Sequence, residues 1–150
     1  MQTDFFIYLT FIVPVFIFLG FFFLILIIVF KLTGWEKIQS IYQTDKTPTE
    51  YFTKWGSVQL NKVSINNFLQ IGVFGDAIYF SLPSIFTKFV KPILIPFKSF
   101  QFVESNHYFI SYEKFHVLDR SNQKIAEIRI PTKYLEKILS RLKDKELDRF

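Results

Sequence analysis

Residues 69–82 read LQIGVFGDAIYFSL, two alternating apolar stretches separated by a glycine and an aspartate. The apolar side chains recur at every second position: Leu69, Ile71, Val73, Ile78, Phe80 and Leu82. A period of two is that of a β-strand with one buried face. Gly75 accepts at little cost the positive φ that a tight turn needs. The stretch therefore predicts a β-hairpin.

The alternation continues on both sides of the hairpin and predicts a series of short strands. One downstream run contains Pro96, which has no N–H to donate to a neighbouring strand. This run is therefore expected to lie at a sheet edge or to bend. Besides the hairpin, strands are expected at residues 58–60, 63–65, 93–103, 108–112, 115–118 and 124–130.

The strand pattern ends at Pro131, where a helical spacing of apolar residues begins. It predicts a C-terminal helix over residues 132–145 with Thr132 as its N-cap, and the apolar stripe of this helix has to be buried. Consecutive short strands followed by one amphipathic helix indicate an α+β fold. We expect a bent antiparallel sheet or barrel of the pleckstrin-homology-like (PH-like) kind over residues 55–147, capped by the helix; a generic small barrel is the alternative.

Residues 5–30, FFIYLTFIVPVFIFLGFFFLILIIVF, contain no charged residue. A helix of this length spans roughly 39 Å at 1.5 Å per residue, more than the ~30 Å hydrocarbon core of a bilayer. A cleavable signal peptide is not expected, because the start is not basic and no small-residue cleavage site follows. The stretch predicts one transmembrane helix and makes the lipid bilayer a partner of the chain.

The flanks of this helix predict its orientation. All 18 lysines and arginines follow Phe30, and Lys31, Lys37 and Lys46 come soon after it. Lys and Arg are enriched on the cytoplasmic side of membrane helices. We therefore expect a single-pass protein of the cell membrane (an inner or plasma membrane) with its C-terminal domain in the cytoplasm. Lys31 is an expected interfacial anchor.

A short juxtamembrane helix is expected at residues 33–43, because Thr33-Gly34-Trp35-Glu36 has the form of a capping box. Its apolar stripe has two interpretations, which stay open. The helix either lies in the headgroup layer with Trp35 as a second interfacial anchor, or packs on the following domain. Residues 44–54, TDKTPTEYFTK, are expected to form a linker.

Residues 83–92, PSIFTKFVKP, are the most suggestive stretch for function. A loop that exposed them would present apolar side chains beside cations, a combination that suits an anionic bilayer surface. In the alternative, the phenylalanines fold back and close one end of the barrel. The residues expected to contact membrane or partner are Phe86, Lys88, Phe89, Val90 and Lys91.

Catalytic, metal and cofactor sites are not expected. The two histidines, His107 and His116, have no ligand partners at metal-binding spacing, and the chain has no cysteine. On a strand, His116 and Asp119 would point to opposite faces. Hydrolase, P-loop and dinucleotide motifs are absent from the sequence. The chain is therefore not expected to be an enzyme.

The net charge of +5 raises the question of nucleic acid binding. Acidic residues are interspersed with the basic ones, above all in the C-terminal RLKDKELDR, and no recognition motif with basic and aromatic residues is present. A mild attraction to anionic lipid headgroups, or a protein partner, is expected instead of nucleic acid.

Several short motifs resemble a group of small bacterial single-pass membrane proteins of unknown function. They are Gly34-Trp35, Trp55-Gly56, Asn67-Phe68-Leu69, the stretch DAIYFSL at 76–82 and the stretch PILIPF at 92–97. The group usually has Trp where this chain has Phe97, and often Gly where it has Ala77. The resemblance covers roughly residues 34–104 and implies no activity.

Taken together, these patterns predict a membrane-anchored binding or scaffolding module whose soluble domain lies at the cytoplasmic membrane surface. The alternative is an accessory subunit of a larger membrane complex, with the span packing laterally. An enzyme would need polar groups that converge in a pocket, and His107, His116 and Asp119 mark where to look for them.

Overall fold

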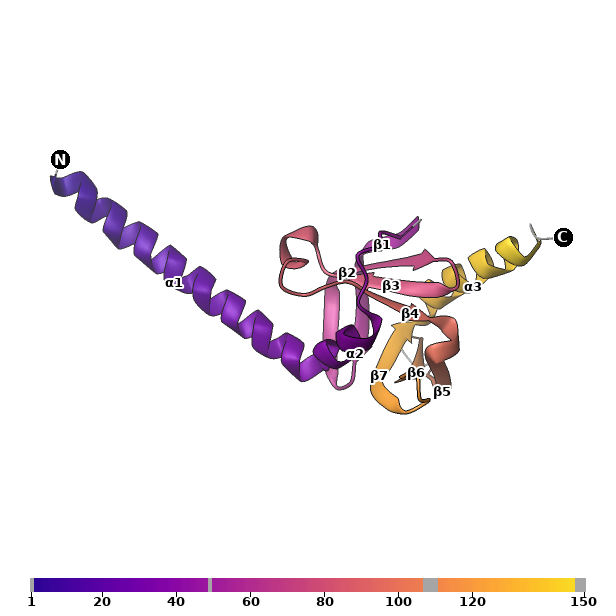
Figure 1. The fold of residues 1–150 in the computed structure, drawn as a ribbon. Helices are drawn as coiled ribbons and strands as arrows, with labels where there is room; N and C mark the ends of the chain where they lie inside the picture. Colours follow the sequence, from indigo (N-terminus) through magenta and orange to yellow (C-terminus); the bar gives the residue numbers. More distant parts are fainter. Residues whose placement is uncertain (1, 49, 107–110, 148–150) are drawn as a thin grey trace. The chain divides into compact units, whose positions relative to one another are not determined.

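The computed structural model describes residues 2–48, 50–106 and 111–147, with side chains described over 10–48, 50–106 and 111–140. Within the chain there are two compact units, Met1–Leu32 and Thr33–Phe150 (Figure 1). The first contains one long helix and the second contains the β-sheet.

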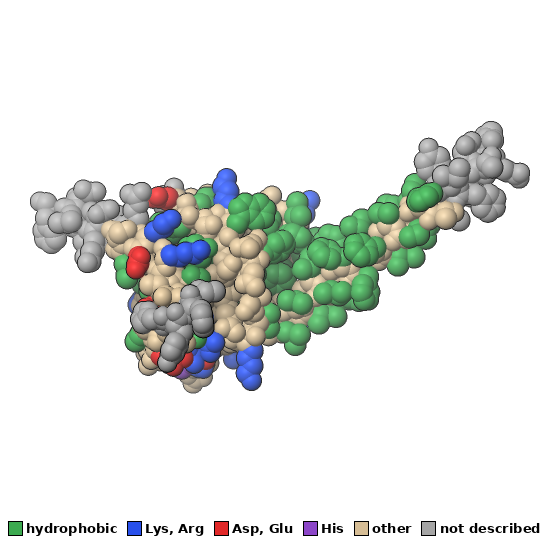
Figure 2. Space-filling view, turned by 180° about the vertical axis from the view of Figure 1, so that it is seen from behind, with side chains coloured by type: hydrophobic (Ala, Val, Ile, Leu, Met, Phe, Trp, Pro, Cys, Tyr) green, Lys and Arg blue, Asp and Glu red, His purple; other side chains and the backbone are tan. Residues whose placement is uncertain are grey.

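Helix α1 (Gln2–Thr33) contains the whole predicted span and continues through Pro14. Its segment Thr10–Thr33, 24 residues with a mean hydropathy of 3.2, is long and apolar enough to cross a membrane. Apolar side chains cover the described surface of this helix (Figure 2). Lys31 lies in its last turn. The exposed side chains of this segment are apolar for the most part, as in a helix that spans a membrane.

The second unit is built on a seven-stranded antiparallel sheet with the order β4-β3-β2-β1-β7-β6-β5. The sheet is not closed, since β4 and β5 are its two edges. The strands are β1 (Glu50–Leu60), β2 (Val63–Phe74), β3 (Ala77–Ser81), β4 (Ile93–Pro96), β5 (Phe100–Asn106), β6 (Tyr112–Leu118) and β7 (Lys124–Pro131).

The two halves of the sheet join through only a short stretch. Strand β1 pairs with β2 along most of its length, but with β7 only at Gln59 and Leu60. This leaves the two halves free to turn away from each other, as Figure 1 shows. The predicted hairpin is confirmed: Phe74 pairs with Ala77 across Gly75, whose φ is 62°.

The predicted strand at 93–103 is wrong as a single element. It is two strands, β4 and β5, separated by the 3₁₀ turn η2 (Phe97–Ser99), and they lie at opposite edges of the sheet. Pro96 ends β4 and the chain bends directly after it, which agrees with the expectation drawn from this proline. Of the strand expected at 108–112, residues 107–110 lie outside the described residues, and Tyr112 begins β6.

Strand β1 begins at Glu50, inside the segment expected to be a linker. Its pairing with β2 shifts register three times, between Tyr51 and Val58. The first two shifts each insert one residue into β1, which turns the following side chains to the other face and breaks the period-two pattern. For this reason alternation could not reveal the first half of β1.

The core lies between the two halves of the sheet and is completed by two helices. From α2 (Trp35–Tyr42), the side chains of Trp35, Ile38 and Tyr42 are buried. From α3 (Thr132–Leu147), Tyr134 and Ile138 are buried. The C-terminal helix is therefore present where its spacing predicted it.

Two predicted caps differ from the observed ones. Thr132 lies inside α3 as its first residue, and its buried hydroxyl has no hydrogen-bond partner among the described residues. At the start of α2 the Thr33 hydroxyl accepts a hydrogen bond from the Trp35 N–H (3.2 Å), not from the third amide of a capping box. Gly34, with φ 74°, is the N-cap residue of α2.

Candidate functional site

The connection between β3 and β4, residues 82–92, is a compact folded loop. It contains the 3₁₀ turn η1 (Ser84–Phe86), and the N–H groups of Phe89 and Val90 both donate to the Phe86 carbonyl at 2.9 Å. The Thr87 hydroxyl donates to the Ser84 carbonyl at 2.7 Å. These bonds hold the β3–β4 loop in a folded turn, and this turn sets the directions of its side chains.

The loop turns one set of apolar side chains inward and another outward. Phe86 is 8% exposed and its ring lies 5.3 Å from that of Phe68, whereas Phe89 is 70% exposed and Ile85 69%. Val90 is half-buried. Of the predicted contact residues, Phe86 is therefore part of the core, whereas the side chain of Phe89 is exposed.

Ile85 was not among the predicted contact residues. Ile85 and Phe89 are four residues apart, as are Phe86 and Val90, and four residues make about one helical turn. Helical periodicity within residues 83–92 would have separated the outward pair from the inward pair.

The two lysines of the loop differ in their surroundings. Lys88 is exposed and has no hydrogen bond or ion pair with the described residues. Lys91 is held from both sides: its N–H donates to Gln39 Oε1 (3.1 Å), and its Nζ lies 3.5 Å from Asp45 Oδ1. Lys88 is therefore the freer cation beside the outward apolar pair.

Trp35 of α2 contacts the end of the β3–β4 loop. Its indole is 3% exposed, and its Nε1–H donates to the Lys91 carbonyl at 3.3 Å. This burial agrees with the packing interpretation that the sequence left open for the helix at 33–43, and the role of Trp35 as an interfacial anchor stays a prediction. Of the two expected anchors, only Lys31 has an exposed side chain.

The segment that follows α2 crosses the outer face of the sheet beside the loop; we call residues 43–48 the strap. It begins at the β4 edge, where Gln43 pairs with Ile93 and the Thr44 N–H donates to the Pro92 carbonyl at 3.0 Å. Farther on, Lys46 Nζ lies 5.1 Å from the centre of the Phe74 ring. The strap leads from α2 to the start of β1 (Figure 1).

A pocket of about 300 Å³ lies between the strap, the outer face of β2 and β3, and the β3–β4 loop. Many of its lining residues carry a hydroxyl group. The pKa of Tyr51 is raised above its ordinary value of 10.0, mainly by partial burial and secondly by the neighbouring Tyr79. The phenol of Tyr51 is therefore protonated at neutral pH. The lining residues are Thr44, Asp45, Lys46, Thr47, Tyr51, Gln70, Tyr79, Ser81, Ser84, Thr87, Lys91 and Pro92.

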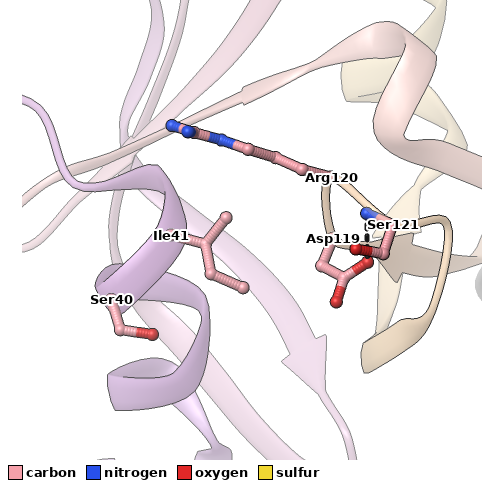
Figure 3. A pocket seen from close by; sticks show the side chains of 5 residues that line it. All are labelled: Ser40, Ile41, Asp119, Arg120 and Ser121. Atoms are coloured by element: carbon pink, nitrogen blue, oxygen red, sulfur yellow. Dashed lines mark hydrogen bonds between the residues drawn. The ribbon is translucent and has the colours of Figure 1, made fainter.

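A second hollow, of about 320 Å³, lies between α2 and the β6–β7 turn. Ile41 projects from α2 toward this turn, and the side chain of Arg120 extends from it (Figure 3). The Asp119 carboxylate accepts the N–H groups of Ser121 and Gln123 at 2.7 and 2.9 Å. Asp119 therefore organises its own turn, and the hollow does not gather converging acid and base groups.

His116 belongs to a charged cluster on β6 and β7, and not to a site with Asp119. The centre of the cluster is Glu127, whose carboxylate lies 3.5–3.6 Å from Lys114, Lys124 and Arg129. Burial raises the pKa of Glu127, but the three cations together outweigh it and hold the pKa below 4.5.

Among the described residues no three potential ligand side chains gather as a metal site would need. His107 lies outside the described residues.

Basic and acidic side chains are interspersed on the visible face of the second unit (Figure 2). They form no single basic patch on that face. No protein-family model, curated protein or solved structure matches the chain. Function therefore has to be inferred from the sites themselves.

Proposed function

We propose that this chain is a single-pass membrane protein whose PH-like domain docks on the anionic cytoplasmic surface of the membrane that holds it. The carrying observation is the outward pair, Ile85 and Phe89, presented on a fixed loop with the free cation Lys88 between them. Apolar side chains enter the boundary between headgroups and acyl chains, and each nearby lysine adds about 1 kcal/mol on an anionic surface.

Helix α1 makes such a weak contact effective. A loop that is tethered to the bilayer by a membrane-spanning helix meets lipid at a high effective concentration, so a modest affinity suffices. The preorganised backbone of the β3–β4 loop lowers the conformational entropy lost on contact. Together these features support a docking or scaffolding role at the membrane surface.

The PH-like assignment is part of this proposal. A four-strand half and a three-strand half that diverge after a short shared stretch, followed by a C-terminal helix, are the layout expected of that fold. The resemblance to small bacterial membrane proteins is also part of this proposal. The motifs of this chain that carry the resemblance lie on α2, β1, the hairpin and β4.

The test uses the full chain in lipid nanodiscs. Because the chain has no cysteine, Ile85→Cys provides a single site for a fluorophore. We expect quenching by spin-labelled lipid to be stronger for this label than for Ser121→Cys on the β6–β7 turn. Quenching of the label at position 85 should increase when phosphatidylglycerol is added to phosphatidylcholine.

Adding Lys88→Glu to the labelled chain should reduce this phosphatidylglycerol-dependent increase in quenching at least about fivefold. A factor of about five in an equilibrium constant corresponds to about 1 kcal/mol. Lys98→Glu, at an exposed lysine outside the loop, is the matched control. Equal quenching at Ile85 and Ser121 in every lipid mixture would contradict the proposal.

The alternative, an accessory subunit of a larger membrane complex, draws on the exposed phenylalanines of α1, among them Phe16, Phe18 and Phe21. Membrane helices associate through side-chain packing, which such a surface permits. A photo-crosslinking residue in place of Phe18 should then capture a protein neighbour in cells. Recovery of the chain alone would count against this alternative.

A further inference from the structure

The pocket beside the β3–β4 loop has walls from three separate parts of the domain. Thr44 and Thr47 come from the strap, Tyr79 from the sheet, and Ser84 and Thr87 from the loop. A volume of about 300 Å³ is at the small end of the range for ligand sites, which suits a headgroup-sized molecule.

The hydroxyl groups of the lining offer both donors and acceptors. Thr44 Oγ1 accepts the Lys46 N–H (3.1 Å) and still has its own proton to donate. Thr87 Oγ1 donates to the Ser84 carbonyl and still has lone pairs to accept with. The Thr47 and Ser84 hydroxyls have no partner among the described residues. Such a lining matches a ligand with several hydroxyl groups.

The charges favour a ligand with one negative charge. Two lysines, Lys46 and Lys91, line the pocket with a single carboxylate, Asp45. Asp45 pairs with Lys91 at 3.5 Å, whereas Lys46, over the Phe74 ring, has no ion pair with a residue that the structure describes. A phosphodiester carries one negative charge, whereas neutral sugars and zwitterionic headgroups would leave this cation unmatched.

We propose that this pocket binds a phosphorylated polyol, the chemistry of a phosphoglycerol lipid headgroup. The inference rests on the proposed membrane docking, because Ser84, Thr87 and Lys91 belong to the loop that carries Ile85 and Phe89. Docking of the loop recruits the domain to anionic lipid in general, and the pocket then selects one headgroup among anionic lipids.

Native mass spectrometry of the full chain in detergent micelles tests the pocket without a membrane surface. The micelles contain equal amounts of phosphatidylglycerol and phosphatidylserine. We expect phosphatidylglycerol to be retained preferentially, and Lys46→Gln or Lys91→Gln to lower its retention about fivefold each. The main-chain bonds of Lys91 to Gln39 and Trp35 survive these changes, and Lys62→Gln is the control.

A second variant fills the pocket without changing its charge. Ser84→Tyr places a bulky side chain at an exposed wall position and keeps the main-chain carbonyl to which Thr87 bonds. It should abolish the preference for phosphatidylglycerol while leaving the thermal unfolding temperature near that of the parent chain. Equal retention of the two lipids by the parent chain would overturn the proposal, as would a preference that survives in Ser84→Tyr.

A competition arm distinguishes the source of the ligand. Excess glycerophosphoglycerol, the deacylated phosphodiester headgroup, should displace little lipid if the acyl chains contribute to binding. Full displacement at comparable concentration would overturn the lipid headgroup as the source and assign the pocket to a soluble polyol phosphate. Ile85→Ser with Phe89→Ser separates the two proposals, since it should abolish docking in nanodiscs but leave headgroup selection in micelles intact.

Discussion

Gly72 lies near the C-terminal end of β2, opposite Tyr79 on β3, where the strap crosses the sheet. A Cβ atom at this position would lie 2.5 Å from the Glu50 carbonyl oxygen and 2.9 Å from Pro48 Cβ. The absence of a side chain is therefore what lets the strap approach the sheet. Because the strap is one wall of the pocket, Gly72 also shapes the pocket.

Gly72→Ala should destabilise the domain by about 1–3 kcal/mol, the usual cost of overpacking, because a main-chain oxygen has to move. Thermal unfolding of the full chain, followed by near-ultraviolet circular dichroism, measures this. Gln70→Ala, on the same face and strand, is the matched control. A Gly72→Ala variant as stable as that control would contradict the close approach of the strap.

Glu127 is a second residue whose surroundings lead to a prediction. Its pKa is lower in the folded chain than its ordinary value of 4.5. A lowered pKa in the folded state stabilises the fold above the ordinary value, and this contribution is lost as the pH falls through the lowered pKa. The cluster around Glu127 therefore stabilises the domain at neutral pH and not in strong acid.

Glu127→Gln should lower the unfolding temperature at pH 7. The difference from the parent chain should shrink as the pH falls from 5 toward 3. Glu136→Gln, at an exposed position on α3 outside the cluster, is the control and should not reproduce this convergence. A difference that stays constant with pH would show that the carboxylate charge of Glu127 does not stabilise the fold.

At the scale of elements, α2 is an integral part of the β-domain. Asn61, in the β1–β2 turn, donates to the Thr33 carbonyl at 2.6 Å and accepts the Glu127 N–H at 2.9 Å. It thereby ties the start of α2 to β7. Gly34 adopts φ 74° beside it, and a Cβ there would lie 2.7 Å from Asn61 Nδ2.

Gly34→Ala should therefore displace Asn61 and impose a strained backbone at the start of α2. We expect a loss of at least about 1 kcal/mol of stability and faster proteolysis of the strap, whose position follows from that of α2. Ser40→Ala, on the exposed side of α2, is the control. Unchanged proteolysis in Gly34→Ala would indicate that α2 is not held by this junction.

Element boundaries were predictable where the chain follows one period without interruption. The hairpin turn, β7 and α3 were predicted because their apolar residues repeat regularly, whereas the separate strands expected at 63–65 and from Leu69 are one strand, β2. Strand β1 was missed over its first half because bulges break its alternation. The run at 93–103 was joined into one strand because its apolar pattern is continuous across the 3₁₀ turn.

At the scale of the whole molecule, the proposed docking depends on the orientation of the chain in the membrane. Lys31, Lys37 and Lys46 follow the apolar segment, and the positive-inside bias predicts a cytoplasmic domain. With this orientation the β3–β4 loop and the pocket would meet the anionic leaflet. With the opposite orientation, the docking proposal loses its lipid partner.

Arg120→Cys introduces a single exposed thiol on the β6–β7 turn. In intact cells a membrane-impermeant maleimide should not label it, and permeabilisation should make labelling complete. A thiol at Gln2→Cys, before the apolar segment, should be labelled by the same maleimide in intact cells. Labelling of the Arg120→Cys chain from outside would place the domain on the other side of the membrane.

The sequence by itself determined the features that depend on neighbouring residues: one long apolar helix, a period-two series of strands and a C-terminal amphipathic helix. The tertiary structure alone decided which side of each element is buried against segments far away in the chain. It placed Phe86 inside and Phe89 outside, buried Trp35 beneath the Lys91 carbonyl, and brought the strap across Gly72. The physical reason is that periodicity records the burial of a residue relative to its neighbours, whereas a pocket needs distant segments to meet, and no local pattern records that meeting.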